Sequence, residues 1–366
     1  MKNIHLIAAA RPNFMKIAPL WHALSKESWC RASIVHTGQH YDPNMSDAFF
    51  RDLAMPKPHF HLEIGSGSHA GQTGGVMIAY EKVAMAEQPD WIVVVGDVNS
   101  TAACAMVGAK LWIPVVHLEA GLRSRDRRMP EEINRLVTDS IADVLWTPSR
   151  DGDENLLREG VPADRIECIG NIMIDSYEMM RGAIEADGTR SGLGLAPQGY
   201  GVVTLHRPSN VDTREALAPL VEALLTVSQR VPLVFAVHPR TRKKLQEFAL
   251  MERLSGSGAV RVVDPLGYIQ FMNLVTGARV VITDSGGVQE ETTYLGIPCL
   301  TLRENTERPV TVTEGSNRLV APAALVESLD AALAQRGRAG RVPDLWDGRA
   351  ASRAVASLKR RSGVAA

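Results

Sequence analysis

Short apolar runs rich in β-branched residues alternate with longer helical patterns along this chain, and the whole series occurs twice. The runs of the first series are Ile4–Ala9, Ala32–Thr37, Phe60–Ile64, Trp91–Gly96, Val115–Leu118, Val144–Thr147 and Ile166–Ile169. Those of the second series are Gly201–Leu205, Leu233–Val237, Val260–Val263, Arg279–Thr283 and Cys299–Leu302. Continuous apolar strands separated by helices predict a parallel sheet covered on both faces.

A stretch rich in Gly, Ala, Ser and Pro, residues 182–200, interrupts the pattern before the second series begins. The length of 366 residues also suits two domains. We therefore predict an α/β protein with two doubly wound, Rossmann-like domains, residues 1–170 and 171–350. The last helical stretch, residues 351–366, could pack back on the first domain.

The composition argues against several classes of protein. The formal net charge is −1 and no long basic run occurs, so nothing indicates a nucleic-acid partner. The cysteines are scattered without a C-x-x-C pair, which predicts neither a disulfide framework nor a metal site. No apolar run approaches the ~20 residues of a membrane span, and the N-terminus leads directly into a predicted strand. We therefore expect a cytoplasmic protein that makes no membrane contact.

Residues 280–298 carry the clearest ligand-binding pattern. A β-branched run ends in Asp284-Ser285-Gly286-Gly287, and a helical pattern with Glu290 and Glu291 follows at once. Glycines allow close backbone approach, and a helix N-terminus favours a phosphate. One of the glutamates could accept hydrogen bonds from a ribose diol. The pattern predicts half of a nucleotide-sugar site, and the alternative is an ordinary strand–turn–helix with a solvated acidic face.

Three carboxylates are predicted at strand ends or helix starts of the first domain. Asp97 follows one strand, Glu119 follows the next, and Glu131 begins a helix. Carboxylates brought together repel one another, so such clusters usually bind a metal or move protons. No His/Cys spacing supports a metal. Cations that an anionic diphosphate needs are available instead from Arg11, Lys16, Arg123, Arg135, His206 and Arg207.

Gly65–Ala70 matches the G-x-G-x-x-A dinucleotide fingerprint, but its context is wrong. The segment follows the third predicted strand, and no acidic residue ends a strand about 20 residues later. We predict a loop here and no nicotinamide site.

Several motifs occur together in one order: Ala10–Pro19, Gly96-Asp97, His117–Arg123, Pro130–Arg135, His206-Arg207, Thr283–Glu291 and Thr306–Pro309. In combination they resemble the non-hydrolysing UDP-N-acetylglucosamine 2-epimerases over nearly the whole chain. The resemblance implies a GT-B fold, with two Rossmann-like domains facing across a cleft. It also implies interconversion of UDP-N-acetylglucosamine and UDP-N-acetylmannosamine without a cofactor or a metal. A cytoplasmic homodimer serving cell-surface polysaccharide biosynthesis is the corresponding expectation.

The resemblance also implies a role for individual residues. The catalytic groups would be Asp97, Glu119, Glu131 and His206, with Asp97 and Glu131 as first choices for proton transfer. The diphosphate or sugar would be held by Arg11, Lys16, Arg135, Ser285, Gly286, Gly287 and Arg308. Glu291 would bind the ribose diol, Phe271 would stand near the uracil unless it is ordinary core packing, and backbone groups around Leu266 would read the uracil edge.

The chemistry is consistent with elimination. The C2 hydrogen of the sugar has no neighbouring carbonyl, so direct deprotonation is too costly. A base can instead take this proton as UDP leaves C1, and UDP then adds back to the 2-acetamidoglucal. Open alternatives are a 2-epimerase of a related UDP-acetamido sugar or uronate, a hydrolysing epimerase, a GT-B glycosyltransferase and a nucleotide-sugar sensor.

Two departures from the family pattern concern activation by a second UDP-N-acetylglucosamine. Pro208 stands where many members have Arg, and Tyr41-Asp42-Pro43 differs from activated members, although Gln39-His40 and His238 are retained. Because Pro208 removes a cation and a backbone donor, we expect activation to be weak or absent.

Overall fold

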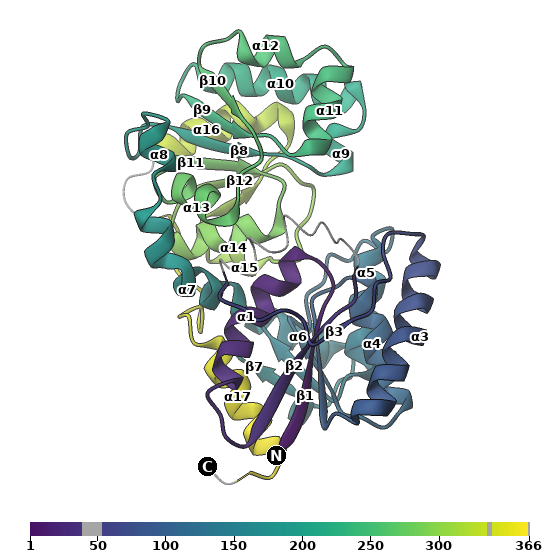
Figure 1. Ribbon diagram of the computed structural model, residues 1–366. Helices are drawn as coiled ribbons and strands as arrows, with labels where there is room; N and C mark the ends of the chain where they lie inside the picture. Colours follow the sequence, from purple (N-terminus) through teal and green to yellow (C-terminus); the bar gives the residue numbers. More distant parts are fainter. Residues whose placement is uncertain (39–52, 335–338, 365–366) are drawn as a thin grey trace. The chain divides into compact units, whose positions relative to one another are not determined.

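The computed structural model describes residues 1–38, 53–334 and 339–364 (Figure 1). The chain forms two compact units, one of Met1–Met179 with Asp344–Ala366 and the other of Met180–Pro343. Each unit is a parallel sheet with helices, and the predicted α/β class is confirmed.

The first unit contains, within its described residues, a seven-stranded parallel sheet of order β3-β2-β1-β4-β5-β6-β7. Its strands are β1 (Lys2–Ala8), β2 (Cys30–His36), β3 (Phe60–His61), β4 (Trp91–Val95), β5 (Val115–Leu118), β6 (Val144–Thr147) and β7 (Ile166–Cys168). Its helices are α1 (Arg11–Leu24), α3 (His69–Glu87), α4 (Asn99–Lys110), α5 (Pro130–Ile141), α6 (Arg150–Arg158), a 3₁₀ turn at Ala163–Arg165, the first part of α7 (Ile172–Ala186) and α17 (Ala350–Arg361).

The second unit contains, among the residues described, a six-stranded parallel sheet of order β10-β9-β8-β11-β12-β13. Its strands are β8 (Gly201–Thr204), β9 (Leu233–Ala236), β10 (Val260–Val263), β11 (Val280–Thr283), β12 (Cys299–Thr301) and β13 (Asn317–Leu319). Its helices are the end of α7, α8 (Thr189–Gly192), α9 (Pro208–Val211), α10 (Arg214–Ser228), α11 (Pro239–Glu247), α12 (Met251–Ser255), α13 (Tyr268–Thr276), α14 (Gly286–Leu295), α15 (Val310–Thr313), a 3₁₀ turn at Pro322–Ala324 and α16 (Leu325–Ala334).

The central strands form because their residues can be buried on both faces. All five residues of β4, Trp-Ile-Val-Val-Val, are buried, and so are all four of β11. Helices cover each sheet and fill its core with Leu, Val and Ala side chains. Side chains at strand ends are therefore the ones left to meet a ligand.

Both sheets reverse their strand order at one point, between β1 and β4 in the first unit and between β8 and β11 in the second. The connections on either side of such a point run in opposite directions, and this opens a crevice at the carboxyl ends of the two strands. Asp97 follows β4, and Ser285 and Gly286 follow β11. The predicted site residues therefore gather where a doubly wound sheet binds ligands.

The structure differs from the sequence predictions in one unit boundary, in the end of β3 and in one additional strand, and several other strand ends shift by one or two residues. The units divide at Met179/Met180 rather than 170/171, because the start of α7 packs in the first unit, where Ser176 Oγ donates to the carbonyl of Met15. β3 ends at His61 rather than Ile64, since Glu63 adopts a left-handed φ of 56° that no strand continues. β13 was not predicted, since three residues give no readable alternation.

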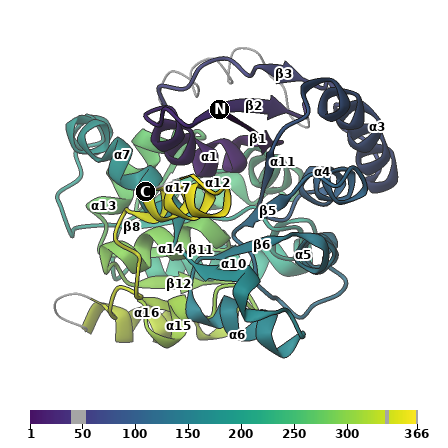
Figure 2. The ribbon, with the colours of Figure 1, turned by 90° about the horizontal axis from the view of Figure 1, so that it is seen from below.

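The C-terminal helix α17 belongs to the first unit. Figure 2 shows α17 lying across α1. Ser357 of this helix and Ser362 directly after it accept hydrogen bonds from the indole N–H groups of Trp146 and Trp91, each at 3.0 Å. The segment after Pro343 therefore returns to the sheet at which the chain began.

Candidate active site

The Asp97 turn in the first unit is held by helix α5. The carboxylate of Asp97 accepts from Nη1 of Arg135, and the carbonyl of Asp97 accepts from Nδ2 of Asn134 at 2.9 Å. The Asp97 side chain keeps 33% of its exposure, whereas Arg135 keeps 2%. A solvent-accessible carboxylate is thus aligned by a buried guanidinium, and the structure brings these two predicted residues together.

Glu132, which the sequence analysis did not select, anchors the same arrangement. Its carboxylate lies 2.7 Å from Nη2 of Arg135 and accepts from the backbone N–H groups of Ser124 and Arg125, each at 2.9 Å. Burial raises the pKa of Glu132, but the N–H donors and Arg135 outweigh burial and leave the pKa below its ordinary value. Glu132 therefore fixes Arg135, while its neighbour Glu131 is only half-buried in the first turn of α5.

Glu119 forms a buried ion pair with Lys16 of α1. Its backbone has φ 74°, which costs free energy for any residue with a Cβ and is typical of functional sites. Gly96, at φ 68°, lies against this pair, because a Cβ on Gly96 would stand 3.3 Å from both Oε2 of Glu119 and Nζ of Lys16. Asn13 of α1 donates to the carbonyl of Val95 at 3.1 Å, which links α1 to the end of β4.

The first unit therefore joins four predicted residues in two carboxylate–cation pairs, Asp97–Arg135 and Glu119–Lys16, at the ends of adjacent strands. Arg11 begins α1, but its side chain lies outside what the structure describes, as do Gln39, His40 and residues 41–43. The predicted roles of these residues stay predictions.

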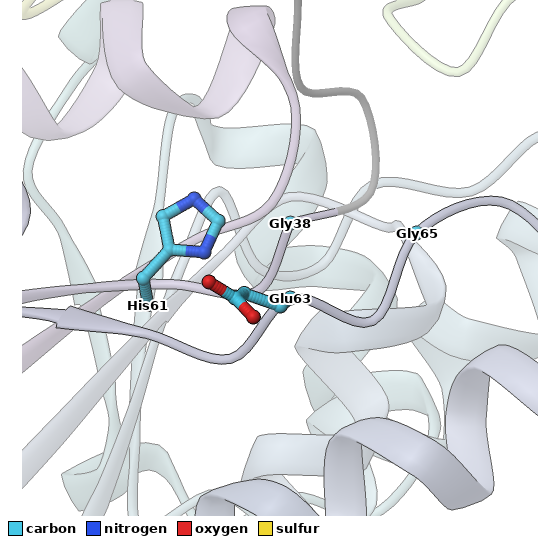
Figure 3. A pocket seen from close by; sticks show the side chains of 4 residues that line it. All are labelled: Gly38, His61, Glu63 and Gly65. Atoms are coloured by element: carbon cyan, nitrogen blue, oxygen red, sulfur yellow. The ribbon is translucent and has the colours of Figure 1, made fainter. Parts of the chain in front are cut away.

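A small cavity of about 280 Å³ lies in the first unit and is lined by Gly38, His61, Glu63 and Gly65 (Figure 3). Nε2 of His61 is 2.8 Å from Nδ1 of His36, the last residue of β2. None of the four lining residues was predicted as a site residue. The Gly65–Ala70 segment leads into α3, where Ser68 caps the helix by accepting from the N–H of Gly71.

In the second unit, Asp284 organises the turn that carries His206. Its fully buried carboxylate accepts from the backbone N–H groups of His206 at 3.0 Å and Arg207 at 2.9 Å, and from Nδ2 of Asn210 at 3.0 Å. Nδ1 of His206 lies 3.1 Å from the same carboxylate. Burial raises the pKa of Asp284, but His206, the Arg207 amide and Asn210 lower it by more than burial raises it. The pKa is therefore below its ordinary value, and the group stays ionised.

The predicted phosphate-binding turn, Ser285 to Gly287, begins α14 beside a buried ionic cluster. Arg308 pairs with Glu307 at 2.6 Å and with Glu290 at 2.8 Å. A Cβ on Gly286 would lie 2.9 Å from Oε1 of Glu307, whereas one on Gly287 would meet nothing within 4 Å. Gly286 is therefore required by its protein neighbours, and the space beside Gly287 is open.

Glu291 and the predicted uracil-binding residues lie on α14 and α13. Burial, with a smaller contribution from Glu290, raises the pKa of Glu291 to about 8, although a hydrogen bond from Tyr268 opposes the rise. Phe271 is half-buried in α13, and Leu266 lies in the loop before that helix. The structure brings Tyr268 of α13 to Glu291, a contact that the sequence did not reveal.

In the described ranges, no group of three or more His, Cys, Asp or Glu side chains is arranged to hold a metal ion. The helices within those ranges also include none with the length and apolar character needed to cross a membrane.

Comparison with known proteins decides the family. Residues 22–359 match the profile of the family described as UDP-N-acetylglucosamine 2-epimerase. The chain belongs to the UDP-N-acetylglucosamine 2-epimerase family. It is 43% identical over 325 residues to the UDP-N-acetylglucosamine 2-epimerase of Methanocaldococcus jannaschii, covering 87% of this chain and 88% of the relative. The family resemblance found in the sequence is confirmed, and the protein is an epimerase, hence an isomerase.

Two further comparisons refine this assignment to the epimerase family. The crystal structure of the Methanocaldococcus jannaschii epimerase in complex with UDP-GlcNAc and UDP is similar, with a TM-score of 0.89 and 40% identity over 98% of this chain and 99% of that one. This likeness confirms the GT-B type of fold. The UDP-2,3-diacetamido-2,3-dideoxy-D-glucuronate 2-epimerase of Pseudomonas aeruginosa is 42% identical, over 88% of this chain and 89% of its own length. Identity alone therefore does not choose the sugar.

Proposed function

We propose that this epimerase interconverts UDP-N-acetylglucosamine and UDP-N-acetylmannosamine by eliminating UDP and adding it back. The observation that carries the proposal is the double carboxylate–cation arrangement, in which Asp97 pairs with Arg135 and Glu119 pairs with Lys16 at adjacent strand ends. A Methanocaldococcus jannaschii relative that is 43% identical bears the name of this activity.

The reaction is balanced without a cofactor. A base removes the C2 proton, its electron pair forms the C1–C2 double bond, and the C1–O bond breaks as UDP departs with its electrons. The intermediate is a 2-acetamidoglucal. In the return step UDP oxygen bonds to C1, and an acid delivers a proton to the opposite face of C2. Two faces require two acid/base groups, since one side chain cannot reach both.

Asp97 and Glu131 are assigned to the two proton transfers. Asp97 is suited to this work because a buried guanidinium aligns it while part of its surface stays exposed. Glu131 begins the same helix that supplies Arg135. Glu119, buried with Lys16, is assigned to orienting that cation or a sugar hydroxyl.

The second unit is assigned to holding UDP after the C1–O bond breaks. Ser285, Gly286 and Gly287 present a helix N-terminus, which suits the diphosphate. His206, oriented by Asp284, would stabilise the developing negative charge. Arg308 would neutralise phosphate charge, Glu291 would bind the ribose, and Phe271 with Leu266 would bind the uracil. In the first unit, Arg11 and Arg135 would neutralise charge at the sugar site.

The test is incubation with UDP-N-acetylglucosamine in D2O, followed by ¹H NMR. We expect deuterium at C2 and UDP still attached in a mixture of two epimers. Free N-acetylmannosamine would indicate a hydrolysing enzyme. Absence of both exchange and turnover would overturn the proposed substrate.

A second candidate substrate is a UDP-diacetamido uronate, because the Pseudomonas aeruginosa relative with that activity in its name is 42% identical. Both UDP-sugars are compared under the same conditions. The proposal requires kcat/KM to be higher for UDP-N-acetylglucosamine, and the reverse ranking would transfer the assignment to the uronate.

The other expectations drawn from the family resemblance stay proposals. They are a cytoplasmic homodimer and a role in cell-surface polysaccharide biosynthesis. Light scattering at several protein concentrations measures the oligomeric state, and a mass of one chain at all concentrations would contradict the dimer.

A further inference from the structure

His117 lies on β5, two residues before Glu119, and its side chain is fully buried. Its Nε2 lies 2.8 Å from the backbone carbonyl oxygen of Gly96. A carbonyl oxygen can only accept a hydrogen bond, so Nε2 must carry a proton. This contact ties the imidazole of β5 to the turn that follows β4 and carries Asp97.

The other ring nitrogen, Nδ1, lies 2.5 Å from Oδ1 of Asp139 in α5. The second oxygen of Asp139 accepts from the N–H of Gly121 at 3.1 Å and from Nη1 of Arg123 at 2.7 Å. Burial raises the pKa of Asp139, but His117 and Arg123 together outweigh burial and lower the pKa below its ordinary value. The ring therefore bridges the carbonyl of Gly96 and the carboxylate of Asp139.

We propose that His117 is a positioning residue which holds the Gly96–Asp97 turn against Glu119. Its two ring nitrogens contact the carbonyl of Gly96 and the carboxylate of Asp139, so the ring links the turn after β4 to helix α5. Its effect on catalysis rests on the proposed function.

The position of Gly96 explains why this contact affects the site. A Cβ at Gly96 would stand 3.3 Å from Oε2 of Glu119 and 3.3 Å from Nζ of Lys16, so this backbone lies directly against the ion pair. Movement of the Gly96 carbonyl would displace Asp97 from Arg135 and press on Glu119. One ring therefore sets the separation between two predicted catalytic carboxylates that belong to different strands.

The charges around His117 come from several elements. Carboxylates are supplied by Asp139 of α5, Glu119 after β5 and Asp97 after β4, and cations by Lys16 of α1, Arg123 after β5 and Arg135 of α5. Arg123 is also bound by Glu159 at 2.6 Å.

His5 provides a matched internal control on the same sheet. It is likewise fully buried, on β1, but its Nδ1 lies 3.1 Å from the hydroxyl of Tyr80, which can donate or accept. This contact ties His5 to α3 and not to the Gly96–Asp97 turn. Burial, with a smaller effect of His59, lowers the pKa of His5 to about 4.

The two contacts are measured by solid-state NMR of the full chain labelled with ¹⁵N at its histidine ring nitrogens. We expect the His117 ring to lie next to the Gly96 backbone and the Asp139 side chain, and the His5 ring to lie next to Tyr80. The signals are assigned by their loss in His117→Asn and His5→Asn, or by these contacts themselves if a variant does not fold. A His117 ring without contact to Gly96 would overturn the proposal.

The positioning role is measured with the same two variants. Asparagine in His117→Asn can reach Gly96 or Asp139 but cannot bridge both. We expect C2 exchange to fall at least about 30-fold while the UDP affinity stays within twofold, and His5→Asn to exchange at the wild-type rate per folded molecule. Wild-type exchange in folded His117→Asn, or equal loss in both variants, would refute the positioning role. A wild-type enzyme without activity on UDP-N-acetylglucosamine would contradict the proposed function but not the contacts of His117.

Discussion

Arg135 binds the carboxylate of Asp97 through Nη1 while its Nη2 lies 2.7 Å from Glu132. One guanidinium thus joins two carboxylates. Glu132 is buried and also accepts from the Ser124 hydroxyl and two backbone N–H groups, whereas Asp97 is a third exposed. The fork geometry of arginine allows both contacts at once, which a lysine ammonium on a flexible stem does not reproduce. The orientation of Asp97 therefore depends on a residue identity and not only on a positive charge.

Replacing Arg135 by lysine tests this dependence. We expect Arg135→Lys to lower kcat by about 30-fold, equivalent to about 2 kcal/mol of transition-state stabilisation, because Asp97 loses its fixed partner. UDP affinity should change little. The matched control is Arg158→Lys in the exposed pair with Glu154, for which kcat should be unchanged. Equal kcat values for wild type and Arg135→Lys would show that Asp97 does not need this alignment.

Asp284 should be the most sensitive carboxylate of the second unit. In Asp284→Asn an amide N–H₂ would face the N–H groups of His206, Arg207 and Asn210, so we expect a loss of about 2–4 kcal/mol in the free energy of unfolding. Asp330→Asn, which removes an exposed pair with Arg230, should cost under about 1 kcal/mol. Urea unfolding at pH 7 gives both values, and similar losses would contradict the role of Asp284.

The stability difference between wild type and Asp284→Asn should depend on pH. The pKa of Asp284 is lower in the folded protein than its ordinary 3.8, so the folded state binds fewer protons there than the unfolded state. The stability that the ionised carboxylate supplies is therefore present above pH 3.8 and is lost as pH falls through the lower, folded pKa. The difference between wild type and Asp284→Asn should shrink only below pH 3.8.

The two glycines of the predicted phosphate turn should respond differently to alanine. Gly286→Ala places a methyl 2.9 Å from Glu307, so it should disturb the Arg308 cluster and lower both stability and UDP affinity. Gly287→Ala meets no protein atom within 4 Å, so it should fold with normal stability. If the diphosphate lies against Gly287, this variant should still bind UDP at least about tenfold more weakly, a cost of about 1.4 kcal/mol. Calorimetry measures both affinities, and normal UDP binding by Gly287→Ala would remove Gly287 from the site.

Glu291 should destabilise the folded protein as pH rises. Burial first, then Glu290, raises its pKa from 4.5 to about 8, so the folded state holds a proton that the unfolded state has lost. Below pH 4.5 the Glu291 side chain does not change the free energy of unfolding with pH, and from there to about pH 8 it lowers this free energy increasingly. Glu291→Gln should therefore become progressively more stable than wild type as pH rises through this window. Thermal melts from pH 5 to 8 test this, with exposed Glu252→Gln as the control, and a gap that does not widen would contradict the buried acid.

Much of the fold could be predicted because strands that are buried on both faces have continuous apolar sequences. Runs such as Trp91–Gly96 are apolar at every position, and parallel strands buried on both faces require this. β13 was missed because Asn317–Leu319 has one buried and two less buried residues and forms only by pairing with β12. The division between the units was misplaced because α7 is one continuous helix that contributes to both.

The predicted strand ends showed where the site residues lie, but not which side chains form ion pairs with them. Asp97, Glu119 and Ser285 were readable as polar residues after apolar runs. The pairing of Asp97 with Arg135 joins residues 38 positions apart, and that of Glu119 with Lys16 joins residues 103 apart. Such pairs depend on strand order, which the alternation of elements does not give. Glu132 was passed over beside Glu131 because only helical phase and the Ser124 N–H decide which of them is buried.

In the proposed mechanism Asp97 moves the C2 proton while the second unit holds UDP. Wild type and Asp97→Asn are compared for deuterium incorporation at C2 of UDP-N-acetylglucosamine in D2O, with UDP affinity measured on the same samples. We expect Asp97→Asn to lose exchange by at least about 1000-fold, or about 4 kcal/mol, while binding UDP as wild type does. Wild-type exchange in folded Asp97→Asn would contradict this mechanism.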